Sequence, residues 1–256
     1  MASNLVRFGI PGIALLLAAL FVFAVFRSAE RAGLPPRERV KQAGLAALGV
    51  TGFMAFIAAL ALSGLLGRFD LRPPPLVLWM VGTLVSALAV GFSRLGRRLA
   101  EQLPLVALVG FQAFRLPLEL VMHRAATDGV MPRVMSFGGY NFDIVSGTLA
   151  ALLGVALARG LAVPRSVLVL WNVVGLTLLG VIVTIALLAT PVFHVFGEKE
   201  LNIWVTQFPY CWMAVMVSSA LLGHVLLLRR LRAEVRNGDV VLREDGRERG
   251  AVVALR

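Results

Sequence analysis

One apolar stretch of the chain carries four side chains able to bear charge or form hydrogen bonds: Gln112, Arg115, Glu119 and His123. A helix turns by about 100° per residue, so these four positions fall within an arc of about 80° on one helical face. The remaining face carries mainly alanine, leucine and valine. Because ionisable groups in an apolar segment are costly unless they face other helices or a wet cavity, this spacing predicts a polar stripe inside a helical bundle.

The stripe combines a fixed charge with groups that can exchange protons. Arg115 supplies a permanent positive charge, and Glu119 follows four residues later, where it can form an ion pair. The order Arg before Glu is the weaker arrangement, so we expect Arg115 to need a second partner on another helix. His123 is the side chain that changes charge near neutral pH. Pro117 frees the carbonyl of Ala113 and predicts a kink at this depth.

Two more polar residues stand at the start of the next apolar segment. Asn141 and Asp143 follow a loop rich in methionine, glycine and aromatic residues, which we expect to lie over the mouth of the bundle. Both residue types are suited to capping a helix start. A capping aspartate at this position can still approach Arg115 or His123, so capping and ligand binding remain compatible roles.

The last apolar segment contributes a further candidate. It opens with WVTQFPYCW, in which Gln207 is predicted near the outer third of the helix as a hydrogen-bonding group. Pro209 predicts a second kink at a depth similar to that of the first. The other polar residues of the late segments, Asn172 and His224, are predicted near the cytoplasmic ends of their helices.

The sequence contains few of the motifs that bind metals or cofactors. No compact motif such as H-E-x-x-H is present, and no phosphate-binding or dinucleotide-binding glycine motif. Both lysines fall in connections, which excludes a retinal Schiff base inside a helix. The sequence therefore predicts no particular cofactor. One alternative remains open, a zinc site made from the four ligand-type side chains Glu119, His123, Asp143 and His194.

The composition defines the class of protein. The chain has 256 residues, of which 59% are hydrophobic and 15% charged, and its formal net charge is +11. A soluble domain usually has about 25% charged residues. The arginines cluster beside apolar runs, so we attribute the positive charge to membrane topology and anionic headgroups and expect no nucleic-acid partner. The single Cys211 cannot form an intrachain disulfide.

Apolar runs of about 20 residues predict an all-α bundle of seven transmembrane helices. The positions expected for them are about residues 8–26, 43–66, 74–92, 103–123, 142–158, 167–189 and 203–228. Arginine and lysine are concentrated in every second connection, which places the N-terminus outside and the C-terminus in the cytoplasm of a bacterial inner membrane. Residues 1–232 form the predicted membrane domain. Residues 233–256 form a charged cytoplasmic tail, either mobile or folded as a small hairpin.

Several of these motifs resemble those of a family of bacterial multi-pass membrane proteins of unknown activity. The shared features are an R-x-P-x-E-L-V-x-H helix, here in FRLPLELVMHR, and an F-x-G-x-N-F-D-I loop, here in MSFGGYNFDIVSG. The resemblance implies a shared fold from the second span to the seventh. It draws attention to the set Arg115, Glu119, His123, Asn141 and Asp143, and it implies no activity.

The sequence thus predicts an outward-facing polar pocket that binds or translocates a small polar ligand, an ion or a proton. The candidate site residues are Gln112, Arg115, Glu119, His123, Asn141, Asp143 and Gln207. Two alternatives stay open. The first is a membrane-embedded enzyme, with or without a metal. The second is an accessory subunit whose stripe binds another membrane protein. The identity of the ligand and the oligomeric state are not determined at this level.

Overall fold

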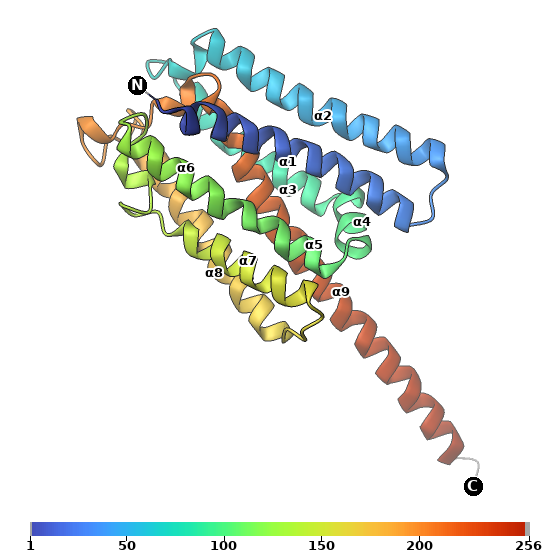
Figure 1. Cartoon of the computed structure of the whole chain (residues 1–256). Helices are drawn as coiled ribbons and strands as arrows, with labels where there is room; N and C mark the ends of the chain where they lie inside the picture. The colour runs from blue at the N-terminus through green and yellow to red at the C-terminus, as the bar shows by residue number, and fades with distance from the viewer. Residues whose placement is uncertain (1, 254–256) are drawn as a thin grey trace.

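The computed structural model describes the backbone of residues 2–253 and the side chains of residues 2–235. Over this range the chain is helical and contains no strand, which confirms the all-α prediction (Figure 1). The main helices are α1 (Asn4–Arg31), α2 (Pro36–Leu62), α3 (Pro75–Phe92), α4 (Arg94–Gln102), α5 (Leu105–Gly110), α6 (Arg115–Thr127), α7 (Asp143–Ala158), α8 (Arg165–Leu188) and α9 (Met213–Val253).

Six helical segments in the described part of the chain are long and apolar enough to cross a membrane, so the protein is a multi-pass membrane protein. One of them, Leu105–Thr127, joins α5 and α6 through a short 3₁₀ turn at Phe111–Phe114. α7 is apolar as well, but has only 16 residues. The other five are α1, α2, α3, α8 and the first part of α9, from Tyr210 to Val235.

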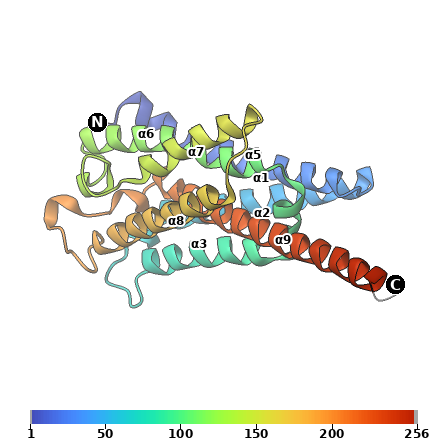
Figure 2. The same cartoon turned by 90° about the horizontal axis from the view of Figure 1, so that it is seen from below.

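Helix α9 occupies the middle of the bundle and packs against α1, α3, α4, α5 and α8. α2 lies along α1, and α7 lies between the α5–α6 segment and α8. The two chain ends lie at opposite ends of the bundle, and the C-terminal part of α9 extends beyond the other helices (Figures 1 and 2). This arrangement brings α6, α7, α8 and α9 together around one interior region.

Proline and glycine mark the helix boundaries. Pro36 and Pro75 are the first residues of α2 and α3, a position where the missing N–H costs nothing. Gly129 and Gly160 follow α6 and α7 with φ values of 70° and 76°, the left-handed conformation that glycine adopts without a steric penalty. Both ends of α3, α7 and α8 lie within two residues of the predicted ones, whereas α1 and α2 begin four and seven residues earlier than predicted.

Helix α7 closely approaches α6 at Gly147 and α5 at Gly154. A Cβ atom on Gly147 would lie 2.5 Å from the backbone nitrogen of Leu116, and one on Gly154 would lie 3.0 Å from the Cα atom of Gly110. Small residues allow such backbone contact between membrane helices. The close approach sets the start of α7 directly against Arg115.

The sequence prediction is wrong about the connection after α3. Residues 94–102 were expected to form a loop, but they form the helix α4, whose N-cap Ser93 accepts a hydrogen bond from the backbone of Gly96 at 3.1 Å. Leu99 and Ala100 are buried, while Arg97 is exposed. One apolar face is enough to hold this short helix across the end of the bundle, because it packs on α1, α3 and α9.

The predicted start of the last span is also wrong. The segment from Ile203 was expected to be helical, but α9 begins at Met213, after two 3₁₀ turns. Pro209 therefore lies before the helix and produces no kink. Pro117 lies in the first turn of α6, and the irregular backbone lies just before it, at Phe111–Phe114. Proline has no N–H to donate to the helical hydrogen-bond ladder, and the backbone is irregular just before Pro117 and around Pro209.

Of the two alternatives predicted for the charged tail, a mobile segment or a small hairpin, the hairpin is wrong. α9 continues as one helix through the tail as far as Val253, and residues 254–256 lie outside the described residues. Arg230 and Glu234 form an i,i+4 ion pair of 2.7 Å near the point where α9 leaves the bundle. Arginine and glutamate are good helix formers, so a helix that already exists is extended here more easily than it is replaced by a hairpin.

We predict that Gly147→Ala destabilises the protein by about 1–3 kcal/mol, because the new methyl group would overlap the backbone of α6. The matched control is Gly12→Ala in α1, where a Cβ atom would meet nothing within 4 Å. Both changes gain the same helix propensity. Thermal unfolding in detergent, followed by tryptophan fluorescence, should lower the midpoint for Gly147→Ala alone. Equal midpoints for the two variants would contradict close α6–α7 packing.

Candidate functional site

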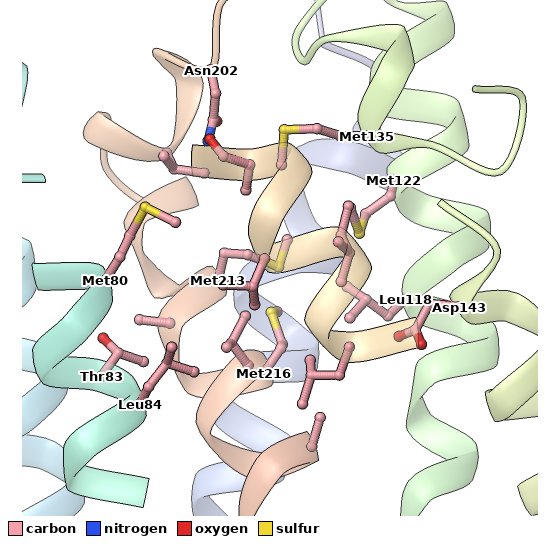
Figure 3. A pocket seen from close by; sticks show the side chains of 18 of the residues that line it. Met80, Thr83, Leu84, Leu118, Met122, Met135, Asp143, Asn202, Met213 and Met216 are labelled. Carbon is pink, nitrogen blue, oxygen red and sulfur yellow. The ribbon is translucent and has the colours of Figure 1, made fainter. Parts of the chain in front are cut away.

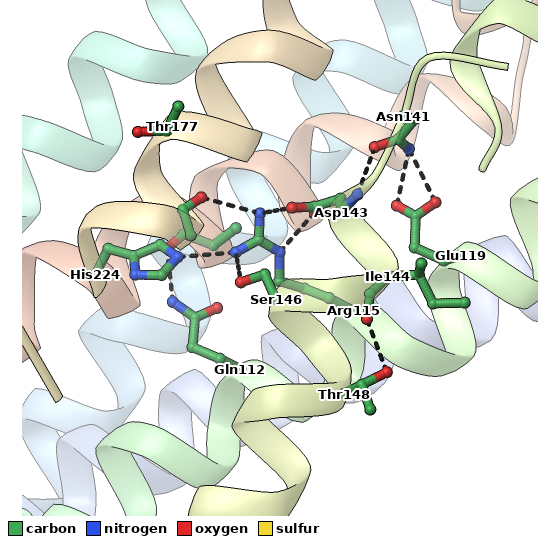
Figure 4. A network of polar contacts seen from close by, with 12 residues as sticks. Gln112, Arg115, Glu119, Asn141, Asp143, Ile144, Ser146, Thr148, Thr177 and His224 are labelled. Carbon is green, nitrogen blue, oxygen red and sulfur yellow. Dashed lines mark hydrogen bonds and ion pairs between the residues drawn. The ribbon is translucent and has the colours of Figure 1, made fainter. Parts of the chain in front are cut away.

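The centre of the site is Arg115, the first residue of α6, whose side chain is 1% exposed. Its guanidinium forms a two-pronged ion pair with Asp143 at the start of α7 (Figure 4). Nε donates to Oδ2 of Asp143 at 2.6 Å, and Nη2 donates to Oδ1. This fork-to-fork geometry is the strongest form of an Arg–carboxylate contact. The predicted need of Arg115 for a partner on another helix is thus met by Asp143.

The remaining donors of Arg115 are also used. Nη1 donates to Oγ of Ser146 at 2.9 Å and to Nε2 of His224 at 2.8 Å. Nη2 also donates to the carbonyl oxygen of Gly175, at 3.4 Å. A guanidinium has five N–H donors, and all five have a partner here. Arg115 consequently ties α6 to α7, α8 and α9 at one point.

The contacts of His224 define its tautomer. Nε2 faces an N–H of Arg115, which has no lone pair, so Nε2 must accept this hydrogen bond. Nδ1 lies 2.8 Å from Oδ1 of Asn172 and therefore carries the proton and donates it. His224 is thus a neutral imidazole protonated on Nδ1, held between α8 and α6. Trp171 packs beside the ring, with 5.6 Å between the ring centroids.

Glu119 has different contacts from those expected. Its carboxylate accepts from Nδ2 of Asn141 at 3.0 and 2.9 Å, and no ion pair joins it to Arg115. The predicted i,i+4 pair is therefore wrong, because Asp143 on α7 engages the guanidinium. Asn141 also donates to the carbonyl of Met135 at 3.1 Å. Its Oδ1 accepts from the backbone N–H of Asp143 at 3.1 Å, so it caps α7 as well as holding Glu119.

A cavity of about 110 Å³ lies beside these polar groups. Arg115, Glu119 and Asp143 contribute to its wall, and most of the remaining wall is apolar. Figure 3 shows methionine side chains around the space and Asp143 at one side of it. The methionines that line the cavity are Met80, Met122, Met135, Met213 and Met216. Methionine is flexible and polarisable, which lets a cavity adapt to the shape of an apolar group.

Gln112 belongs to the helix junction and is not among the residues that line the cavity. It is buried, and its Nε2 donates to the backbone carbonyl of Ala220 in α9 at 2.9 Å. A Cβ atom on Gly223 would lie 2.7 Å from Nε2 of Gln112, so an alanine there would displace the Gln112 amide. Gln112 therefore holds the α5–α6 junction against α9.

The structure separates three predicted residues from the site. His123 is stacked on Phe137 of the following loop, with 4.1 Å between ring centroids, and is not part of the Arg115 network. Gln207 is exposed in the connection before α9, because the helix begins later than predicted. His194 is also in a connection, 3.3 Å from Glu198.

The alternative zinc site is not supported by these positions. Glu119 accepts a hydrogen bond from Asn141, and Asp143 is paired with Arg115. His194 lies in the connection between α8 and α9, where it contacts the carboxylate of Glu198. Among the described residues, no group of three or more His, Cys, Asp or Glu side chains is placed to hold a metal ion. The four predicted ligands, Glu119, His123, Asp143 and His194, thus do not converge.

Sequence reasoning missed four members of the network: Ser146, Asn172, Gly175 and His224. The error for His224 follows from the predicted helix start at Ile203, which put this residue near the far end of the span. α9 begins ten residues later, so His224 lies in the middle of the membrane-spanning part. A usable signal was present, since Asn172 and His224 are isolated polar residues within otherwise apolar runs.

Comparison with family models, curated proteins and solved structures gave no match to this chain.

We predict that breaking the Arg115–Asp143 pair is strongly destabilising. Asp143→Asn leaves a buried guanidinium without its counter-charge, which costs about 3–5 kcal/mol. Arg115→Met leaves the carboxylate unpaired, with a similar cost. The double variant Arg115→Met/Asp143→Leu should be more stable than either single variant, because neither charge remains.

Unfolding in mixed detergent micelles would measure this double-mutant cycle. The exposed pair Arg68–Asp70, at 2.7 Å, serves as the control, and its loss should leave the midpoint unchanged. If the two single variants and the double variant lose stability additively, the buried pair is not the coupled unit described above.

The tautomer of His224 gives a spectroscopic prediction. Selective ¹⁵N labelling of histidine should show a protonated Nδ1 and an unprotonated, hydrogen-bonded Nε2 for this residue. Arg115→Met should change the Nε2 resonance, while Phe137→Leu, which alters the ring stacked on His123, should leave it unchanged. A protonated Nε2 in the wild-type protein would show that the hydrogen bond to Arg115 does not form.

Proposed function

We propose that the chain spans a bacterial inner membrane seven times, with its N-terminus outside and its C-terminus in the cytoplasm. The seventh span is α7, whose 16 residues reach about 24 Å along a helix axis. It packs between the α5–α6 segment and α8 within the bundle, which favours a crossing over a surface position. The opposite positions of the two termini agree with an odd number of crossings.

The distribution of positive charge supports this orientation. Arginines and one lysine gather at the end of the bundle where α1 joins α2, where α4 lies, and where α9 leaves. Cytoplasmic connections carry such an excess. The opposite end, with the connection between α6 and α7, is then external. Met135 and Asn202, from the α6–α7 and α8–α9 connections, line the cavity, so the cavity lies towards the outside.

We propose that this cavity binds a small organic cation, such as a short alkylammonium, in exchange for a proton on Glu119. The observation that carries the proposal is the position of Glu119, buried to 2% exposure in the cavity wall. Within the described residues, no Arg, Lys or His lies within 4.0 Å of its carboxylate. A carboxylate buried in a membrane requires either a proton or a cation, so the two compete for the same oxygen atoms.

No neighbouring charged side chain among the described residues neutralises the carboxylate of Glu119. Arg115 is committed to Asp143, and the two charges cancel within a pair whose hydrogen bonds are complete. Asn141 orients the carboxylate of Glu119 without neutralising it. The network therefore fixes the position of Glu119 and leaves its charge to be balanced by what enters the cavity.

The rest of the cavity fits the apolar part of such a ligand. Apolar side chains form most of the wall, methionine and leucine prominent among them, together with the aromatic rings of Phe114 and Trp79. Aromatic faces attract organic cations, and methionine adapts to varied shapes. A dry cavity of about 150 Å³ holds one benzene molecule, so a cavity of about 110 Å³ takes a ligand of only a few heavy atoms.

We predict that the purified protein binds tetramethylammonium or n-propylammonium with the release of one proton per ligand. Because protons compete for Glu119, the affinity should fall as the pH is lowered. Glu119→Gln retains an acceptor for Asn141 but lacks the charge, so binding should weaken more than tenfold and proton release should disappear. Calorimetry in two buffers of different ionisation enthalpy measures both quantities.

Glu101→Gln, which alters an exposed carboxylate of α4, is the control and should bind as the wild type does. An uncharged analogue of n-propylammonium with the same number of heavy atoms, n-propanol, should bind weakly and release no proton. Wild-type affinity in the folded Glu119→Gln variant, or binding without proton release, would refute the proposed exchange.

A further inference from the structure

A second, larger cavity of about 630 Å³ lies on the side of α9 away from the Arg115 network. It is bordered by α1, α2, α3, α4, α5 and α9, and its wall is almost wholly apolar. Residues that represent these walls are Leu17, Val50, Val90, Leu99, Leu108 and Leu222. It shares no lining residue with the cavity beside Glu119, so it is a separate feature of the fold.

The geometry of α2 opens this cavity towards the lipid. Over its 27 residues α2 buries only Met54 and Ile57, since it packs mainly along α1. It meets α3 through Phe53 and Trp79, whose ring centroids are 4.9 Å apart, near the end of α2 that leads into α3. Towards the other end, α2 presents Gly49 to the cavity, and a Cβ atom there would meet nothing within 4 Å.

The size of the cavity fits a lipid chain. A dry cavity of about 150 Å³ holds the six carbons of benzene, so one of 630 Å³ has room for on the order of twenty carbons. Moving a CH₂ group from water into an apolar cavity is favourable, but an acyl chain that enters from a bilayer leaves a solvent that is already apolar and gains little. Specific retention of a lipid therefore requires recognition of its headgroup.

Positive charge is present where that headgroup would lie. Arg27 lines the cavity itself, and Arg98 of α4 donates from Nε to Oγ of Ser28, the next residue of α1, at 3.2 Å. Arg27 shares the single carboxylate of Glu30 with Arg39. Arg27, Arg39 and Arg98 thus lie at this end of the cavity with the one carboxylate of Glu30, which only Arg27 and Arg39 contact, so a net positive charge remains at the mouth.

Other arginines at this end have structural roles. Arg229 donates to the backbone carbonyls of Gly91 and Ser93, and Arg230 donates to that of Glu101 at 2.6 Å. These bonds fasten α4 across the ends of α3 and α9. α4 is therefore a short amphipathic helix fixed at headgroup depth, and its Leu99 closes the apolar cavity while Arg98 flanks it.

We propose that this cavity holds one acyl chain of an anionic phospholipid whose phosphate is bound by Arg27 and Arg98. Phosphate is recognised by guanidinium groups through paired charge-assisted hydrogen bonds, and basic pockets between membrane helices bind anionic headgroups. The lipid enters between α2 and α3 from the leaflet on the side of α4. This site does not depend on the proposed cation exchange at Glu119.

Native mass spectrometry of the full chain, titrated with phosphatidylglycerol and phosphatidylcholine of the same acyl chains, tests the proposal. The wild type should retain one phosphatidylglycerol at least fivefold more strongly than phosphatidylcholine. Arg27→Gln/Arg98→Gln should bind the two lipids equally. The control Arg97→Gln/Arg159→Gln loses the same charge from exposed positions and should keep the preference.

A second pair of variants tests the chain-binding part. Gly49→Trp fills the cavity and should abolish retention of phosphatidylglycerol. Gly52→Trp places the same side chain on an exposed position of α2 outside the cavity wall and should retain it. Retention by Gly49→Trp, or equal retention of both lipids by the wild type, would overturn the proposal.

Discussion

The architecture depends on the buried ion pair between Arg115 and Asp143. A charge in the middle of a membrane bundle is tolerated only when its hydrogen bonds and its counter-charge are supplied by the protein. Arg115 receives both, from Asp143 and Ser146 on α7, from Gly175 on α8 and from His224 on α9. Four helices must therefore be in place at once for the arginine to be buried at all.

This constraint also accounts for the state of Glu119. Because α7 approaches α6 closely at Gly147, Asp143 reaches the guanidinium and Glu119, four residues along α6, is left with Asn141. The chain thus contains one carboxylate that is electrostatically saturated and one that is held but not neutralised. Only the second has chemical freedom, and it lies in the wall of a cavity whose other groups are mostly apolar.

The bundle has two unlike sides about the central helix α9. One side is closed by the polar network around Arg115, and a small cavity lies next to it. On the other side α2 is packed mainly on α1, and a larger apolar space extends to the arginines of α1 and α4. Membrane helices gain little from burying leucine against leucine, since lipid is an equivalent solvent, so an apolar space open to lipid is tolerated on this side.

The helical membrane class could be predicted from the sequence, because long apolar runs cross a bilayer as helices. The burial of Gln112, Arg115 and Glu119 could be predicted as well, because polar side chains in such a run are stable only when they face other helices. It did not determine which carboxylate pairs with Arg115, nor that His224 joins it. Those outcomes depend on the close contact of α6 with α7 and on the late start of α9 at Met213. Distances between helices and their relative depth arise from packing among segments far apart in the chain, so they became known only from the folded structure.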